Sequence, residues 1–294
     1  MQEIVVLSGK GGTGKTVVTA SFAALSRRKV LCDCDVDAAD LHLLLRPTVR
    51  ETHEFWARPL AEIDLDKCSR CGLCLDACRF DAIRDFRVDP FACEGCRLCQ
   101  QVCPGEAVTL RENLAGHWYV SDTRYGTLVH ARLGPGKENS GELVAVVRGR
   151  ARKIAREQGA EYILSDGPPG IGCPVISSLS NVSLALIVTE PSLSGIHDLE
   201  RVLAVCRHFR VTPLVCMNKH DLDQNATRRI RHYCDQAGVE VAAMIPFDAA
   251  VTEAVVQGVP LVEYSDGPAA RAVVQLLLDV LKGLSKERRA HARV

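Results

Sequence analysis

The sequence lacks an excess of charge of either sign, a secretory signal and an apolar run suited to a membrane. Its 294 residues include 36 lysines and arginines against 36 aspartates and glutamates, so a basic nucleic-acid-binding surface is not expected. No charged region followed by an apolar one opens the chain. A long uncharged stretch, 171–189, contains Gly172, Pro174 and Asn181, which suits a loop, a helix and a strand better than a membrane span. We therefore predict a cytoplasmic protein without membrane attachment or a nucleic-acid partner.

The chain is rich in cysteine. With 47% apolar and 24% charged residues, the composition excludes the disordered and fibrous classes. The chain has 14 cysteines, and in a cytosolic protein such usage points to metal binding or catalysis before disulfides. Eight of them lie between Cys68 and Cys103, which predicts a metal centre there. The others stand among apolar residues, and five of them are expected in the core: Cys32, Cys34, Cys206, Cys216 and Cys234.

Strand and helix patterns alternate over most of the chain. Residues 3–8 form a short β-branched run that leads into glycines, which is typical of a buried parallel strand. A helix is expected from Thr16 to about Arg27, and a second strand, 29–35, ends in acidic residues. Further strand-like runs lie at 162–165, 184–189, 214–217 and 239–245. The alternation predicts an α/β fold with a doubly wound, mostly parallel sheet.

The alternation stops between about Ala61 and Asn113, where cysteine, aspartate and glycine dominate. We interpret 61–113 as a small α+β domain inserted into a surface connection of a larger domain made of 1–60 and 114–294. The insert contains a repeat with a period of 25 residues. The pattern C-x₂-C-x₂-C-x₃-C begins at Cys68 and again at Cys93, and Ala-Ile or Ala-Val follows each copy.

A phosphate-binding loop follows the first strand. Residues 9–16 fit G-x-x-x-x-G-K-S/T, and the sequence is Gly9, Lys10, Gly11, Gly12, Thr13, Gly14, Lys15 and Thr16. Between a strand and a helix, the glycines can turn backbone N–H groups towards a phosphate. Lys15 would reach the β- and γ-phosphates, and the Thr16 hydroxyl would ligate Mg²⁺. A plain glycine-rich turn is the alternative. The flanking strand and helix favour a site for ATP or ADP with Mg²⁺.

The additional lysine makes this loop resemble the deviant phosphate loop of the MinD/ParA/Mrp and nitrogenase iron-protein ATPases. The resemblance implies a P-loop NTPase fold and an ATPase that is slow without a partner. It implies a nucleotide-dependent homodimer, or a heterodimer with a paralogue, in which Lys10 reaches the partner's nucleotide. Lys15 would act with Asp35, which would orient the attacking water, and with Asp166, in the segment 166–170, which would hold the Mg²⁺ shell.

Base recognition is also implied by the resemblance. Asn218, in 218–221, and Pro246 and Asp248 match the segments that contact the base. A strand-end Asp can instead be a helix cap, and an Asn-Lys-x-Asp can be a turn. Asp37 and Asp40 fit a switch role and a capping role equally well.

Each half of the cysteine repeat can supply three thiolates to one cubane and a fourth to the other. This resembles the bacterial two-cluster ferredoxin, including Pro104 after the last cysteine, although Arg79 stands where the first half usually has proline. Two 4Fe–4S clusters are implied. Cluster 1 would take Cys68, Cys71, Cys74 and Cys103, and cluster 2 would take Cys93, Cys96, Cys99 and Cys78. Zinc is the competing metal, but the tight spacing, given twice, suits cubanes better.

Cys173 leaves two interpretations open. It lies seven residues after Asp166, the offset at which the nitrogenase iron protein places a ligand of a cluster shared by two subunits. The position of that protein's second ligand holds Asn139 here, so a shared cubane would have only two thiolates per dimer. Cys173 could still contact a guest metal or a partner's cluster. The alternative is a small buried residue at a tight turn.

Three functions follow from these parts. The first is an ATPase whose nucleotide-dependent dimer closure gates electron transfer through two clusters to a redox partner. The second is an ATP-dependent carrier or assembly factor for an iron-sulfur or other metal centre, delivering to a metal-cluster protein, as the Mrp branch suggests. The third, a positioning ATPase, requires a membrane helix or a DNA-binding surface. The final helix, 269–284, is expected to face the core instead.

Overall fold

The computed structural model describes residues 1–135, 137 and 141–291, and Asn139 lies outside them. The chain divides into two compact units, each with its own internal contacts. The first comprises Met1–Thr52, Tyr119–Ala131 and Asn139–Val294, and the second comprises His53–Trp118 and Arg132–Glu138. The sequence places the boundaries of the insert at 61 and 113, inside those of the second unit. No helix of the described residues is long and apolar enough to cross a bilayer.

A nine-stranded sheet organises the first unit, in the order β11-β10-β9-β1-β8-β2-β7-β6-β3. The pairs that join β11 through to β7 are all parallel, and the predicted mostly parallel α/β sheet is confirmed. These strands are β1 (Gln2–Ser8), β2 (Lys29–Asp33), β7 (Gly126–Leu133), β8 (Tyr162–Pro169), β9 (Leu184–Thr189), β10 (Thr212–Asn218) and β11 (Val241–Ile245).

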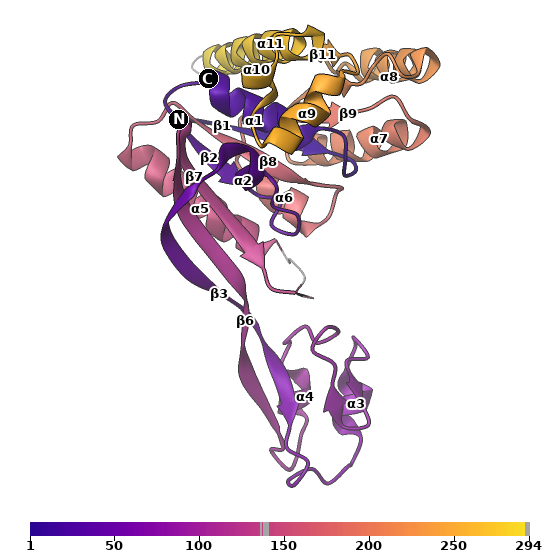
Figure 1. Ribbon diagram of the computed structural model, residues 1–294. Helices are drawn as coiled ribbons and strands as arrows, with labels where there is room; N and C mark the ends of the chain where they lie inside the picture. The colour runs from indigo at the N-terminus through magenta and orange to yellow at the C-terminus, as the bar shows by residue number, and fades with distance from the viewer. Residues whose placement is uncertain (136, 138–140, 292–294) are drawn as a thin grey trace. The chain divides into compact units, whose positions relative to one another are not determined.

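Two strands of 16 residues belong in part to each unit. They are β3 (Thr48–Ile63) and β6 (Val108–Thr123), and Figure 1 draws both as long ribbons. Sequence analysis missed both strands. Strand β3 shows no apolar run, because it is mostly exposed or half-buried and carries charged residues along its length. A single strand thus crosses the boundary that composition placed after residue 60.

Helices cover both faces of the sheet, as Figure 1 shows. They are α1 (Lys15–Leu25), α2 (Leu41–Leu45), α5 (Glu142–Glu157), α6 (Cys173–Leu179), α7 (Leu193–His208), α8 (Gln224–Ala237), α9 (Ala249–Gln257), α10 (Leu261–Tyr264) and α11 (Pro268–His291). The predicted first helix is confirmed, although it begins at Lys15 and ends at Leu25. Strand β1 divides its side chains between the two faces, because Ile4 and Val6 belong to one buried cluster and Val5 and Leu7 to the other.

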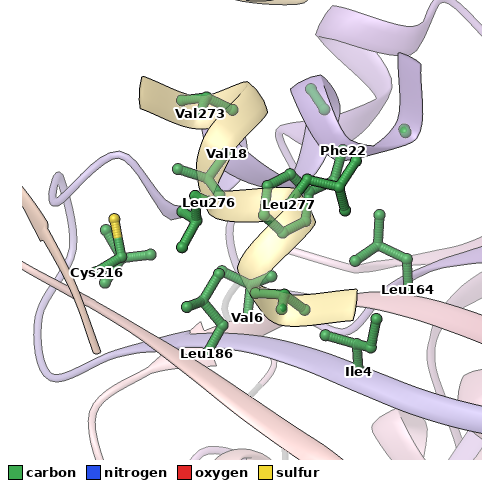
Figure 2. Close-up of a cluster of buried hydrophobic side chains, with 14 of the residues drawn as sticks. Ile4, Val6, Val18, Phe22, Leu164, Leu186, Cys216, Val273, Leu276 and Leu277 are labelled. Carbon is green, nitrogen blue, oxygen red and sulfur yellow. The ribbon is translucent and has the colours of Figure 1, made fainter. Parts of the chain in front are cut away.

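Helix α11 packs on the Ile4 face of the sheet. Figure 2 shows Leu276 and Leu277 above the strands, beside Phe22 of α1. These three side chains are at most 7% exposed. The expected core-facing final helix is confirmed, and so are the five cysteines expected in the core, all of which are buried.

The backbone conformation around the cysteines of the second unit recurs after 25 residues. Helix α3 (Leu73–Ala77) corresponds to α4 (Leu98–Gln101), and a short hairpin of β4 (Ile83–Arg84) and β5 (Arg87–Val88) follows α3. Three pairs of positive φ angles recur at the same offset: Arg70 at 54° and Gly95 at 60°, Gly72 at 84° and Arg97 at 68°, and Asp81 at 49° and Glu106 at 47°. Because positive φ is uncommon outside glycine, three matching pairs mean that both halves follow the same path around their cysteines.

Candidate functional site

The phosphate loop joins the end of β1, at Ser8, to the start of α1, at Lys15. Gly12 and Gly14 have φ angles of 78° and 95°, a conformation that glycine adopts without strain. A Cβ on Gly9 would lie 2.3 Å from Cβ of Asp198, and one on Gly14 would lie 2.4 Å from Nδ2 of Asn218. The loop therefore needs glycine for conformation and for close packing, and it leads into an 11-residue helix whose first N–H groups are available to an anion.

Carboxylates from two adjacent strands gather around Lys15. Strands β2 and β8 are parallel neighbours with Asp33 opposite Asp166, so their carboxyl ends meet. The Lys15 ammonium lies 2.8 Å from the Asp35 carboxylate and 3.6 Å from Asp166. Thr16 donates its hydroxyl proton to Asp166 over 2.7 Å. Four of the residues predicted from sequence are thereby brought together.

Negative charge is in excess at this point. Burial and the nearby Asp166 raise the pKa of Asp33, and burial raises the pKa of Asp166 against the opposing effect of Lys15. Burial alone would lower the pKa of Lys15, but the carboxylates Asp166 and Asp35 outweigh it and raise that pKa. One oxygen of Asp33, Oδ2, is buried without a hydrogen-bond partner. Three buried carboxylates facing one ammonium form a site that a divalent cation would neutralise.

The donor set suits Mg²⁺ bound together with a nucleotide. Among the residues that the structure describes, no group of three or more His, Cys, Asp or Glu is arranged to hold a metal ion. Mg²⁺ usually keeps several waters and takes other oxygens from phosphates, so a hydroxyl and nearby carboxylates suffice. Sequence analysis missed Asp33, although its place two residues before Asp35, at a strand end, is a usable signal.

Lys10 is bound within its own chain. Its ammonium lies 2.7 Å from the Glu190 carboxylate and donates to the hydroxyls of Ser192 and Ser194, each at 3.1 Å. Lys219 approaches the same carboxylate at 3.2 Å. Burial would raise the pKa of Glu190, but the two lysines hold it below its ordinary value. Glu190 therefore holds Lys10 within this chain.

The segments predicted to contact the base have other bonds in this structure. Asn218 donates from Nδ2 to the Thr13 carbonyl over 2.8 Å, which ties the end of β10 to the phosphate loop. Asp221 accepts from the N–H of Phe247, next to Pro246, over 2.7 Å. Asp248 is the N-cap of α9 and accepts from the N–H of Ala250. Asp40 occupies the N-cap position of α2 without a side-chain capping bond.

Cys173 is exposed at the first residue of α6, so the interpretation of it as a small buried residue is wrong. It follows the segment of Asp166, in which Gly170 donates its N–H to the Ser8 carbonyl over 2.9 Å. Position 141 approaches Cys173 closely, because a Cβ on Gly141 would lie 2.8 Å from the Cys173 carbonyl oxygen. Cys173 therefore lies on the surface, three residues after the glycine that contacts the end of β1.

In the second unit, the eight clustered cysteines separate into two sets of four. One cavity is lined by Cys68, Cys71, Cys74 and Cys103, and a second by Cys78, Cys93, Cys96 and Cys99. Burial and then the charges of Cys68, Cys103 and Cys71 raise the pKa of Cys74. Burial and the charges of Cys93, Cys96 and Cys78 do the same for Cys99. Each set therefore brings together three cysteines of one half and the last cysteine of the other.

The last cysteine of each half accepts a backbone hydrogen bond. The N–H of Ala82 lies 3.4 Å from Sγ of Cys78, and the N–H of Ala107 lies 3.3 Å from Sγ of Cys103. Both alanines are at most 2% exposed. Buried N–H groups of this kind stabilise a thiolate, the form in which cysteine binds a metal.

The sheet order, the loop between β1 and α1 and the carboxylates around Lys15 define a P-loop nucleotide-binding protein. Residues 4–261 match the family described as the CobQ/CobB/MinD/ParA nucleotide binding domain. The chain belongs to this family, and it is a P-loop ATPase of the MinD/ParA type.

Individual relatives agree with this assignment. An uncharacterized protein of Methanocaldococcus jannaschii is 34% identical over 226 residues, which are 76% of this chain and 80% of that protein. A putative septum site-determining protein MinD of Oltmannsiellopsis viridis is 27% identical over 270 residues, 88% of this chain and 68% of that one. The fold is similar to that of the septum site-determining protein MinD complexed with Mg-ADP from Pyrococcus horikoshii, with a TM-score of 0.56, 21% identity and coverage of 95% of both chains.

Proposed function

We propose that this ATPase carries two 4Fe–4S clusters in its second unit, and that nucleotide-dependent dimer closure gates electron transfer through them to a redox partner. The observation that carries the proposal is the division of eight cysteines into two cavities of four. The division joins Cys103 to the first set and Cys78 to the second, which is the exchange of ligands that a two-cluster ferredoxin requires.

A cubane suits the spacing of these cysteines better than zinc does. Tetrahedral zinc draws four sulfurs to about 2.3 Å from a single point, and paired C-x₂-C motifs are its usual source. The run C-x₂-C-x₂-C-x₃-C, given twice, is typical instead of the ligands of two 4Fe–4S clusters. The N–H groups of Ala82 and Ala107 would donate to one thiolate of each cluster and influence its potential.

At the nucleotide site, the residues of this chain would exchange partners when ATP binds. A phosphate on the loop would draw Lys15 away from Asp35, with which it now forms a 2.8 Å ion pair. Asp35 would then be free to orient the attacking water, and Thr16 would bind the Mg²⁺ that neutralises the phosphates. Lys10 would leave Glu190 and reach the partner's nucleotide. A cation supplied in this way typically accelerates hydrolysis about 10³- to 10⁵-fold.

The expected coupling between nucleotide and clusters is modest. Coupling free energies of about 1 to 3 kcal/mol are typical of allostery. At about 2.3 kcal/mol per 100 mV, this corresponds to a shift of roughly 40 to 130 mV in a one-electron potential. A shift of that size is measurable by potentiometry with ADP and with a nonhydrolysable ATP analogue.

The experiment that tests the proposal is iron analysis of protein purified without oxygen, with electron paramagnetic resonance of the reduced form. About eight irons per protomer are expected. Cys71→Ser should reduce the iron content, whereas Cys216→Ser, which changes a buried core cysteine, should leave it unchanged. Zinc in place of iron, or equal iron in both variants, would contradict the proposal. Unchanged potentials and electron-delivery rates with either nucleotide would refute the gating alone.

A second function, an ATP-dependent carrier or assembly factor for a metal centre, is favoured by the exposure of Cys173. In that case, the clusters of the second unit would supply electrons, and Cys173 would contact the cargo. Cys173→Ser should then abolish delivery of metal to an apo target protein while the iron content of the second unit stays the same. Delivery at the wild-type rate would exclude this role.

A positioning ATPase is favoured by the similarity to putative septum site-determining proteins. This function gives the second unit's cysteines no role. It therefore predicts that Cys71→Ser and Cys96→Ser leave function intact, and that a fluorescent fusion shows a patterned cellular distribution. Iron-free protein with such a distribution would establish this function in place of electron transfer.

A further inference from the structure

A cavity in the first unit lies at the opposite end of β2 from the nucleotide site. It has a volume of about 370 Å³ and is lined at the end of α1, at the start of β2 and at the turn before β7. Strand β2 begins at Lys29, which lines the cavity, and ends at Asp33, beside Lys15. Four rises of about 3.3 Å separate the two residues, a distance of roughly 13 Å. The cavity is therefore distinct from the phosphate loop, although one strand connects the two.

The cavity is lined by four cations and by no carboxylate. They are Arg27, Arg28, Lys29 and Arg124. Two of them have acidic partners outside the cavity lining, because Arg28 pairs with Glu161 at 2.6 Å and Arg124 pairs with Glu263. The Arg124 guanidinium also stacks over the ring of Tyr125, 4.7 Å from its centroid, which fixes its position. Within the described part of the chain, the guanidinium of Arg27 has no ion pair.

Lys29 is the buried cation of this group, with 6% of its surface exposed. Its ammonium donates to the carbonyls of Ser26 and Tyr125, at 2.7 and 2.8 Å, and the described residues offer it no carboxylate. An ammonium has three N–H donors, so one is left over. Burial lowers the pKa of Lys29 to about 8, as expected of a buried charge without a counterion. Two positive charges, on Arg27 and Lys29, are thus left without an acidic partner.

We propose that this cavity binds a phosphate group. A phosphate monoester carries a charge of about −1.5 to −2 at pH 7, which matches the two unpaired cations. Guanidinium groups suit the geometry of its oxygens. The volume is within the range of small-molecule sites. The source of the phosphate is either a free phosphorylated small molecule or the headgroup of phosphatidic acid, and both offer a phosphate monoester to the same side chains.

The test measures inorganic phosphate binding by calorimetry to full-length protein that is already saturated with Mg-ADP, so that the phosphate loop is occupied. One phosphate per protomer is expected. Arg27→Gln removes an exposed, unpaired cation and should weaken binding at least about tenfold, the effect of losing one charge-assisted contact. Arg231→Gln is the matched control, because Arg231 is exposed on α8 and lies outside the cavity lining. Equal affinities in the two variants would overturn the proposal.

A second arm identifies the source. Sedimentation with vesicles that contain phosphatidic acid, compared with vesicles of phosphatidylcholine alone, reports binding to a headgroup that is a phosphate monoester. Vesicle binding that Arg27→Gln abolishes and Arg231→Gln preserves, without binding of free phosphate, would support the site with a lipid headgroup as its ligand. Failure to bind phosphate and both kinds of vesicle would overturn the proposal.

Discussion

Replacing Glu190 with Gln should promote dimerisation, because Glu190 now binds the lysine that is proposed to reach the partner's nucleotide. The side chains of Lys10 and Glu190 are 31% and 21% exposed and lie 2.7 Å apart. Because solvent partly screens such an ion pair, about 1 kcal/mol is a reasonable value for its free energy. Closing a dimer breaks two such pairs, which costs about 2 kcal/mol in total. Removing the charge should therefore strengthen dimerisation by roughly 30-fold.

Sedimentation velocity with a nonhydrolysable ATP analogue measures this effect directly. Glu200→Gln is the matched control, since it removes the same charge from an exposed position of α7. Glu190 also pairs with Lys219, which lies 3.4 Å from the Gly12 carbonyl of the phosphate loop. For this reason, nucleotide affinity of the monomer should be measured in parallel. If Glu190→Gln dimerises no more tightly than Glu200→Gln at equal nucleotide occupancy, the reasoning about Lys10 is refuted.

Three further predictions concern charge and packing. Asp33→Asn should weaken Mg²⁺-dependent nucleotide binding and raise the free energy of unfolding, because it removes one buried negative charge from a site that has an excess of them. Binding titrations measure the first effect and urea unfolding the second. A loss of stability would contradict this prediction. Burial, and then His42, lower the pKa of His130 to about 4. The neutral histidine therefore leaves the free energy of unfolding intact above pH 6.5, and protonation of the unfolded state lowers that free energy as the pH falls, by about 3 kcal/mol near pH 4. His130→Gln should remove this part of the pH dependence of stability in urea unfolding, and an unchanged pH dependence would show that His130 titrates normally. Gly95→Ala should lower the melting temperature and the iron content more than Gly72→Ala does. A Cβ at position 95 would lie 2.3 Å from the Pro59 carbonyl oxygen, whereas one at position 72 meets nothing within 4 Å. Equal effects would instead point to the positive φ that the two positions share.

The parallel sheet and the phosphate loop could be predicted from the sequence because their signals are local. Strand β1 is a continuous apolar run that ends in glycines, and Lys15 and Thr16 stand at fixed positions after it. Asp33 was missed because its role depends on register: it becomes part of the site only through its pairing opposite Asp166, 133 residues later. The position of Asp33 at a strand end is a local signal, but its pairing with Asp166 has no signature within a short window of sequence.

Other errors have equally physical origins. Strand β3 escaped prediction because its residues are mostly exposed or half-buried, so little alternation of apolar and polar side chains marks it. Cys173 was a candidate for burial because it is small and near a tight turn, but α6 begins at that residue and leaves it exposed. The ion pair of Lys10 with Glu190 depends on a strand end that lies about 180 residues away in the chain, and no sequence motif predicts this pairing.

The two halves of the cysteine repeat are interdependent. Each cavity takes its fourth cysteine from the other half, Cys103 for the first and Cys78 for the second. Neither half can therefore complete a quartet alone, even though three positive φ angles recur at the same positions in both. Whatever fills one cavity therefore contacts cysteines of both halves and ties the two halves together. Filling of the two cavities should be cooperative, so that a partial supply of the ligand yields empty and doubly filled molecules in preference to singly filled ones.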